Sequence, residues 1–404
     1  MIRFLTAGES HGKALSTIVE GFPSNLYLTE EYVNVQLQRR QLGYGRGLRM
    51  KMEPDYAEVI SGLRFQKTLG SPVSMVIRNK DWDNWVDIMS PYERPDKEIE
   101  TISMPRPGHA DLVGVQKYNF DDIRNSIERS SARETAGRVA ACSVARRFLE
   151  EFGIHVGSYV ESTGGIYPVK NYFADLCSNN IPEGLNAYEI AMKADKSQVR
   201  VLEEEQENSI VEKIREAKKN GDTLGGTFVT LATGLPAGLG TYMHYDRRLD
   251  TKIAAAMMSV NAVKAVEIGE GFLLADKPGS LSHDEIILKD DRTWRKTNRA
   301  GGIEGGISTG LPVIVRSAMK PIATLMSPIG SVELKTMNEE ASRRERSDFA
   351  AVAACAVISE SMLAWVLAEL MMEKFGGDSI EETTDNYTVY CSKLNDRLRS
   401  NFRK

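Results

Sequence analysis

The segment from residue 39 to residue 51 has the composition of an anion-binding site. It reads RRQLGYGRGLRMK and contains four arginines, one lysine, three glycines and no acidic residue. Arginine offers paired N–H donors that match phosphate and carboxylate groups, and its charge does not titrate away near neutral pH. Glycine lets the backbone approach a ligand and adopt positive φ. We interpret the segment as a site for a compact anion, with a solvated basic turn as the alternative.

Two of the five histidines lie in glycine-flanked turns and are candidates for proton transfer. His11 is enclosed by glycines in GESHG (8–12), and a Pro-Gly pair presents His109 in RPGHADL (106–112). Histidine is the usual proton-transfer group near neutral pH. A loop histidine can also be structural or simply solvated, but two in such turns are less easily explained that way. The sequence assigns no role to the other three.

A helix is expected to follow the motif ERSSARETAGR (128–138). Ser131 precedes Glu134 by three residues, the spacing of a capping box, and an apolar stripe follows as far as Gly153. Residues 129–131 should therefore lie at a helix N-terminus, where exposed backbone N–H groups favour an anion. Ordinary capping by Ser131 is the alternative, and both can hold together.

Asp348 follows three arginines in the segment SRRERSDF (342–349). The residues alone favour an N-cap role for Asp348 at the start of another helix. A carboxylate beside several arginines also stays ionised to low pH, so Asp348 could act as a base or orient one. A further helix is expected to start near Asp250.

A glycine-rich stretch suggests contact with phosphate but matches no familiar nucleotide motif. Residues 298–310 read NRAGGIEGGISTG, with five glycines in thirteen residues. They contain neither the Gly-Lys-Ser/Thr of a P-loop nor a GxGxxG order. The segment KPIATL (320–325) adds a cation and a hydroxyl group nearby in sequence.

Composition argues against a nucleic-acid-binding protein. The 404 residues contain 51 lysines and arginines against 56 acids, a formal net charge of −5, so there is no broad basic field. None of the four cysteines is in CxxC spacing, so zinc and disulfide frameworks are not expected. The N-terminal residues have no signal-peptide pattern, and together with the thiols this predicts the cytoplasm.

Short β-branched runs bounded by glycine and proline predict strands at 57–62, 71–79, 226–234, 265–272 and 310–320. The sequence at 70–78 faintly resembles that at 310–316, which fits a duplicated sheet motif and fits chance similarity equally well. Residues 349–372 are apolar but interrupted by Glu360 and Glu369, which favours a buried core or interface helix over a membrane span. We expect one domain over 1–404, with a polar surface insertion at 171–219 and a peripheral tail at 376–404.

Taken together, these segments resemble the chorismate synthase family. The matching blocks occur in the family's order and run from residue 8 to about residue 360, most of the chain. They are GESHG, RRQLGYGRGLRMKME, RPGHADLVGVQKY, ERSSARETAGR, MSVNAVKAVEIGEGF, AGGIEGGISTGLP, MKPIATL and ERSDFAAV.

The resemblance implies an α+β fold, a β-α-β sandwich forming a single large domain. It implies a carbon–oxygen lyase that converts 5-enolpyruvylshikimate 3-phosphate to chorismate and phosphate by anti-1,4-elimination, the last shared step toward the aromatic amino acids. Reduced FMN (FMNH2) would be required but not consumed. A homotetramer is implied, with an external flavin reductant because no reductase segment or NADPH-dependent module is visible. No nucleic acid or membrane partner is implied.

The resemblance also implies roles for individual residues. His11 would protonate the departing phosphate, His109 would offset negative charge on the flavin, and Asp348 would take part in removing the C6 proton. The substrate would be held by Arg40, Arg46, Arg49, Arg106, Arg133 and Arg343. FMN would be held by Arg129, Ser130, Ser131, Asn261, Ala262, Gly305, Lys320, Pro321, Ile322, Ala323, Thr324 and Arg346.

The chain departs from the family pattern at four positions, Ala265, Arg299, Ala323 and Ala353, none of which removes an assigned charged or hydroxyl group. Arg299 could crowd or strengthen a flavin phosphate site. Two other function classes remain as alternatives: an anion- or RNA-binding protein using residues Arg39 to Lys51, and a flavin-independent transferase acting on a phosphorylated metabolite.

Overall fold

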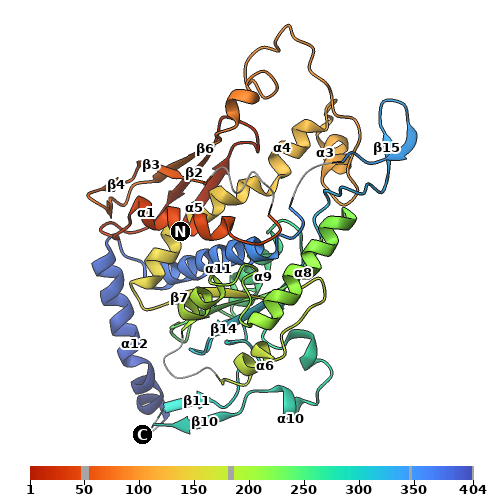
Figure 1. Ribbon diagram of the computed structural model, residues 1–404. Coiled ribbons are helices and arrows are strands. Elements are labelled where there is room, and N and C mark those ends of the chain that lie inside the picture. The colour runs from red at the N-terminus through yellow and green to blue at the C-terminus, as the bar shows by residue number, and fades with distance from the viewer. Residues whose placement is uncertain (47–53, 181–185, 291, 345–347, 403–404) are drawn as a thin grey trace.

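Two four-stranded antiparallel sheets enclose layers of helices in the computed structural model, which describes residues 1–46, 54–180, 186–290, 292–344 and 348–402 (Figure 1). The first sheet has the order β1-β2-β6-β3 and the second β7-β8-β14-β9. The strands of the first sheet are β1 (Arg3–Ala7), β2 (Ala14–Glu20), β3 (Ala57–Ser61) and β6 (Val73–Arg78). Those of the second are β7 (His155–Thr163), β8 (Gly226–Thr233), β9 (Val263–Ile268) and β14 (Val313–Met319).

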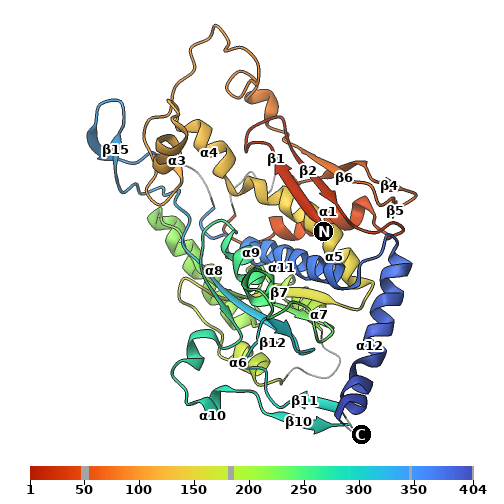
Figure 2. The same cartoon turned by 180° about the vertical axis from the view of Figure 1, so that it is seen from behind.

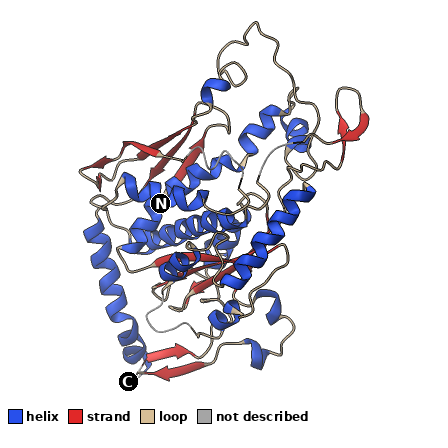
Figure 3. Cartoon of the chain, viewed as in Figure 1, coloured by secondary structure: helices blue, strands red, loops and turns tan. Residues whose placement is uncertain are grey.

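Four helices fill the space between the sheets, as Figure 3 shows by colour. They are α1 (Glu30–Gln41), α5 (Thr135–Glu150), α9 (Leu249–Met258) and α11 (Val352–Phe375). Helix α5 packs on β2 of the first sheet, α11 packs on β7 and β8 of the second, and α5 and α11 pack against each other. The predicted β-α-β sandwich is therefore confirmed.

Helix α11 is apolar around its whole circumference because it lies between both halves of the sandwich. Its length and composition would suffice to cross a membrane, but 94% of its apolar window is buried inside the protein. A helix that is hydrophobic all round is buried in a large core or a membrane. Here the protein core covers it, as predicted for the run at 349–372.

The two sheets share one topology. In each, the first two strands along the chain pair, and the fourth strand inserts between the second and the third. In each, a two-residue hairpin precedes the fourth strand, and a Gly-x-Pro segment leads into it at 70–72 and 310–312. The similarity between 70–78 and 310–316 therefore falls on equivalent strands, β6 and β14, which supports duplication over chance.

The strand predictions at 57–62, 71–79, 226–234 and 310–320 are confirmed as β3, β6, β8 and β14. The prediction at 265–272 was misplaced, because β9 starts at Val263 and the chain turns into a 3₁₀ segment at Gly271–Leu274. Strands β1, β2 and β7 had no sequence signal strong enough to predict them. Inside β7, Gly157 has no space for a Cβ because the Ala187 carbonyl lies there, so the glycine marks a close approach of backbone rather than a turn.

The helix predicted after 128–138 is confirmed as α5, but the predicted placement of residues 129–130 and of Asp348 at helix starts was wrong. Arg129 and Ser130 end helix α4 (Arg124–Ser130) instead of starting a helix, and Ser131 caps a 3₁₀ turn at Ala132–Glu134 that leads into α5. Asp348 is not an N-cap, because α11 begins at Val352 with Ala351 before it. The helix expected near Asp250 is confirmed as α9.

The remaining elements lie around the sandwich. Helix α7 packs on β7, and α12 runs along one edge of the molecule to a C-terminus near β10 and β11, as Figure 2 also shows. The helices are α3 (Asp111–Tyr118), α6 (Tyr172–Cys177), α7 (Ala187–Ala194), α8 (Glu204–Asn220), α10 (Gly279–Ser282) and α12 (Ile380–Phe402). The hairpins are β4–β5 (Leu63–Arg64, Lys67–Thr68), β10–β11 (Ile286–Lys289, Arg292–Arg295), β12–β13 (Ile303–Glu304, Ile307–Ser308) and β15–β16 (Gly330–Glu333, Asn338–Ala341).

A buried ionic cluster joins the two halves around Glu360 of α11. Glu360 is fully buried, and its carboxylate accepts hydrogen bonds from Arg39, Arg146 and Arg200 at 2.7 to 3.0 Å. Ser158 of β7 donates a further bond at 2.6 Å. The three arginines come from α1, α5 and the segment before α8, so one carboxylate connects elements from both sheets.

We expect Glu360→Ala to lower the free energy of unfolding by roughly 3–5 kcal/mol, because it leaves three buried guanidinium groups without their shared partner. Urea unfolding measures this loss. Glu369→Ala is the matched control on the same helix: Glu369 pairs with Lys252 at 2.9 Å, and both side chains are partly exposed. The control should cost about 1 kcal/mol or less; equal losses in both variants would contradict the importance of the cluster.

The cluster also predicts a pH dependence. Burial raises the pKa of Glu360, but Arg39, Arg146 and Arg200 outweigh burial and hold this pKa well below its ordinary value. An unfolded glutamate titrates near about 4.3, so the contribution is complete above that pH and is lost as pH falls toward the native value. Between these values the unfolding free energy should fall more steeply on acidification in the wild type than in Glu360→Gln.

Candidate functional site

A cavity of about 1320 Å³ lies at one end of the helical layers. Its walls come from the turn after β1, helix α4 and the following turn, the turn between α9 and β9, the segment after β14 and the first half of α11. Pockets for one small molecule are typically about 300–1,000 Å³. This cavity therefore has room for more than one small ligand.

The cavity is strongly cationic although the chain as a whole is acidic. Of the residues that the structure describes, ten lysines and arginines line it against three carboxylates. The cations are Arg40, Arg46, Arg106, Arg124, Arg129, Arg138, Lys264, Lys320, Arg343 and Arg344; the carboxylates are Glu128, Glu134 and Asp348. Such an excess requires anionic ligands, because unbalanced cations repel one another at short range.

Most of the predicted site residues meet in this one cavity. Those that line it are His11, Arg40, Arg46, Arg106, His109, Arg129, Ser130, Ser131, Asn261, Ala262, Lys320, Pro321, Ile322, Ala323, Thr324, Arg343 and Asp348. Arg133 and Gly305 do not line it. Arg49 and Arg346 lie outside the described residues.

Arg133 lies behind the cavity wall and stabilises it indirectly. Its guanidinium pairs with Asp55 and with the side-chain oxygen of Asn79. The other oxygen of Asp55 accepts from Arg40 at 3.2 Å. Burial lowers the pKa of Arg40 to about 10, and Asp55 opposes that shift. Asp55 thus neutralises two neighbouring arginines and keeps Arg40 charged at the wall.

Gly305 lies at the turn of the β12–β13 hairpin with φ +58°, and no atom would contact a Cβ there within 4 Å. Gly305 therefore lies apart from the other described residues predicted to hold FMN, and its flavin contact stays a prediction. Arg299 is also absent from the cavity lining; its backbone N–H donates to Asp284 at 2.8 Å, and its Nε lies 4.0 Å from a Glu270 oxygen. It neither crowds nor strengthens the cavity.

His11 is fixed on two sides. Its ring Nδ1 lies 2.9 Å from one carboxylate oxygen of Glu128, and its backbone N–H donates to the other oxygen at 2.7 Å. The ring stacks on the indole of Trp85, with centroids 3.9 Å apart and planes 25° apart. Edge and face contacts together hold the imidazole in one orientation at the cavity wall.

His109 belongs to a different arrangement. Its Nδ1 lies 2.6 Å from Asp111 Oδ1, while Arg106 donates to both oxygens of the same carboxylate at 2.8 and 3.0 Å. Burial acts to raise the pKa of Asp111, but hydrogen bonds from His109 and Arg106 hold it well below its ordinary value. Asp111 therefore stays ionised and orients both cavity side chains.

Asp348 and Arg46 form an ion pair at the mouth of the arginine segment. Arg46 Nε lies 3.2 Å from Asp348 Oδ2. Asp348 is thus a carboxylate in the cavity wall rather than a helix cap. The N-cap interpretation is wrong, and a part of Asp348 in the chemistry stays a prediction.

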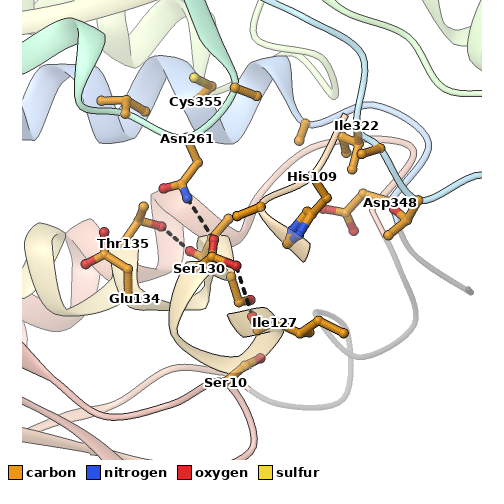
Figure 4. A pocket seen from close by; sticks show the side chains of 18 of the residues that line it. Ser10, His109, Ile127, Ser130, Glu134, Thr135, Asn261, Ile322, Asp348 and Cys355 are labelled. Atoms are coloured by element: carbon orange, nitrogen blue, oxygen red, sulfur yellow. Dashed lines mark hydrogen bonds between the residues drawn. The ribbon is translucent and has the colours of Figure 1, made fainter. Parts of the chain in front are cut away.

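One wall is built from three turns that contact one another. Asn261 Nδ2 donates to the Ser130 carbonyl at 3.1 Å, as Figure 4 shows, and Lys320 N donates to the Ala262 carbonyl at 2.9 Å. The side-chain oxygens of Asn261 and Thr324 are buried without a hydrogen-bond partner among the described residues. Buried polar atoms are normally paired, so both atoms point to a polar ligand against this wall.

Several residues that line the cavity were not predicted from the sequence. Glu128 was quoted as the first residue of ERSSARETAGR, but nothing in the sequence linked it to His11. Trp85 lies in a loop with no motif. Arg124 lies over the Trp85 ring, 5.5 Å from its centroid, and Arg138 pairs with Glu134 across one helical turn. Among these residues, only the i,i+4 spacing of Glu134 and Arg138 in the sequence indicated a contact between side chains.

Comparison with known proteins gives one result throughout. A family model described as chorismate synthase matches residues 2–372. A chorismate synthase of Chlorobaculum tepidum is 52% identical over 399 residues, covering 98% of this chain and 100% of the relative. That of Chloroherpeton thalassium is 53% identical over 393 residues, covering 96% and 99%. A crystal structure of a chorismate synthase is 42% identical, with a TM-score of 0.78 and 98% coverage of both chains.

The turn that carries Asn261 generates a prediction. Ala262 has φ +66°, a left-handed conformation that suits glycine better than alanine. Ala262→Gly should change the unfolding free energy by less than about 1 kcal/mol, because relief of strain offsets added chain entropy. Ala262→Val should cost roughly 1–3 kcal/mol. Ala265→Val, at an exposed position of β9, is the control and should be nearly neutral; a cost equal to that at residue 262 would refute the strain.

Proposed function

The chain belongs to the chorismate synthase family, and from that premise we propose that its cavity holds 5-enolpyruvylshikimate 3-phosphate beside reduced FMN. Phosphate is eliminated from this substrate to give chorismate. The observation that carries the proposal is the cationic cavity itself, with ten lysines and arginines around about 1320 Å³. The substrate bears a phosphate and two carboxylates and FMN bears another phosphate, so the two ligands match both its charge and its size.

The wall formed by residues 130–131, 261–262 and 320–324 suits FMN. It offers two serines, a lysine, and the unpartnered oxygens of Asn261 and Thr324 to the polar edges of a flavin. Arg129, with hydrogen bonds to the carbonyl oxygens of Thr6 and Gly8, is placed to receive a phosphate. The chemistry that reduced FMN supplies when bound is electron density for the allylic centre while the C–O bond breaks.

The opposite wall suits the substrate. Arg46, Arg106 and Arg343 line the cavity, and burial lowers the pKa of Arg343. Guanidinium groups match phosphate and carboxylate geometry through paired donors. Arg40 adds a buried charge held by Asp55. These arginines fix the substrate and offset the repulsion between its three anionic groups.

The reaction requires one proton to be donated to phosphate and one to be removed from C6. When the C–O bond breaks with its electron pair on oxygen, the departing phosphate would be fully ionised unless it gains a proton. His11 donates that proton, and the proton removed from C6 balances it overall. Asp348, in the cavity wall with one oxygen 3.2 Å from Arg46 Nε, takes part in removing the C6 proton. Asp111 holds His109 for contact with the flavin.

Other features of the proposal rest on the family. The reduced flavin comes from an external reductant, and the chain assembles as a homotetramer in the cytoplasm. The four cysteines are free, and three of them are buried, which suits a reducing compartment. Residue Gly305, on a hairpin away from this chain's cavity, would contact FMN only if another copy of the chain supplied it.

The activity is tested by adding reduced FMN and 5-enolpyruvylshikimate 3-phosphate to the protein without oxygen. Chorismate, followed by absorbance, should appear with an equal amount of phosphate, and omission of the flavin should abolish both. A product formed equally well without flavin would favour a transferase. Oxidation of NADPH by the purified protein, at a rate that matches turnover, would contradict the external reductant.

The chemical roles are tested by two variants. His11→Ala and Asp348→Ala should each slow turnover at least about 100-fold, the usual size of an acid–base contribution, while FMN affinity stays near that of the wild type. His244→Ala is the control, because His244 is exposed and outside the cavity. Near-normal turnover in both cavity variants would remove the role assignments and leave the family membership intact.

A further inference from the structure

The carboxylate of Glu128 and the ring of His11 form a close and largely buried contact. The Glu128 side chain is 2% exposed, and the His11 side chain is 24% exposed. His11 Nδ1 lies 2.9 Å from Glu128 Oε1 and 3.1 Å from Glu128 Oε2. The Ser10 N–H also donates to the Glu128 carbonyl at 3.0 Å, so helix α4 holds the whole turn that carries His11.

Glu128 has no other charged partner in the part of the chain that the structure describes. Within that part, no lysine or arginine forms an ion pair with its carboxylate, although ten of them line the same cavity. An ionised carboxylate that is buried and unpaired is strongly unfavourable. A protonated imidazole at His11, with both ring nitrogens carrying hydrogen, would supply the counter-charge at 2.9 Å.

His109 contacts a carboxylate that already has an arginine partner. Asp111 already receives a two-pronged ion pair from Arg106, whose charge neutralises it. His109 adds a hydrogen bond to a carboxylate that needs no further cation. Nδ1 of each cavity histidine thus contacts a carboxylate. The carboxylate beside His11 has no other cationic partner among the described residues, whereas the one beside His109 is already neutralised by Arg106.

We propose that Glu128 is a positioning residue that keeps His11 charged as an imidazolium and aims its Nε2–H into the cavity as the proton donor. This inference rests on the proposed function. In the step itself, the substrate C–O bond breaks with its electron pair on the phosphate oxygen. The Nε2 proton of His11 moves to that oxygen, and the neutral ring regains a proton from solvent before the next turnover.

A carboxylate partner makes an imidazolium a weaker acid, yet the reaction tolerates this cost. A fully ionised phosphate is far more basic than imidazole, so a strong acid is not needed. What the step needs is a proton already present and correctly aimed when the C–O bond breaks. Glu128 supplies the charge balance, and the stacked indole of Trp85 keeps the ring from rotating.

The charge state is tested on the wild-type protein alone, without flavin or substrate, so it does not depend on the activity. With histidines labelled with ¹⁵N, the ring of His11 is identified by its loss in His11→Ala. At pH 7 its two nitrogens should both be protonated in the wild type, whereas His11 should be neutral in Glu128→Gln. A neutral His11 in the wild type, or a charged one in Glu128→Gln, would overturn the proposal.

Catalysis gives a second readout with a matched control. Glu128→Gln should lower kcat by at least about 10-fold, within the range of acid–base effects, with KM for substrate and FMN affinity nearly unchanged. Glu128→Asp should recover part of kcat because the charge is retained. Asp246→Asn, which alters an exposed carboxylate 2.7 Å from His244, should change neither readout.

The outcomes separate the possible failures. Equal losses of kcat in Glu128→Gln and Glu128→Asp, with the charge of His11 unchanged, would show that Glu128 only braces the turn. If the wild type produced no chorismate, the proposed function would fail, while the ¹⁵N result would still decide the charge of His11. If Glu128→Gln failed to fold, Glu128→Asp and the wild-type ¹⁵N spectrum would decide, with a neutral ring in either counting against the proposal.

Discussion

Repulsion among the cations that line one cavity is the constraint on which the rest of the site depends. Besides the three carboxylates that line the cavity, the chain places further carboxylates behind the arginines. Asp55 lies between Arg40 and Arg133, and Asp111 lies behind Arg106. Both acids are buried and are absent from the cavity lining. The protein interior therefore balances part of the charge of the cavity wall.

This arrangement also decides which acids remain for chemistry. Asp111 is fixed by Arg106 and does not exchange protons near neutral pH, because its pKa is held well below the ordinary value. Asp348 differs because it reaches the lining. Glu128 differs again, because its described ion-pair partner is a histidine and not an arginine. The position of a carboxylate in or behind the lining, and the residue that pairs with it, distinguish these acids more than the residue type does.

The sequence located most of the site because its motifs combine residue types that only anion binding brings together. Arg46, His109 and Lys320 come from three such motifs and line one cavity, while their roles stay predictions. The capping rule held at Ser131, which caps the 3₁₀ turn before α5, but it misled at Asp348, because α11 starts only at Val352. The side to which Arg133 turns could not be predicted, because it depends on Asp55, 78 residues away. Long-range pairs of this kind leave no spacing in the sequence.

Duplication of the sheet explains where the cavity lies. Each half contributes the same two connections, from its inner helix to the third strand and from the fourth strand onward. In the first half these carry Arg46 and His109; in the second they carry Asn261 and Asp348. The turn between the first two strands is not shared: it is short in the first half and presents His11, but in the second it spans α6, α7 and α8. The two halves thus contribute equivalent segments to the cavity, and His11 comes from the one turn that is not shared.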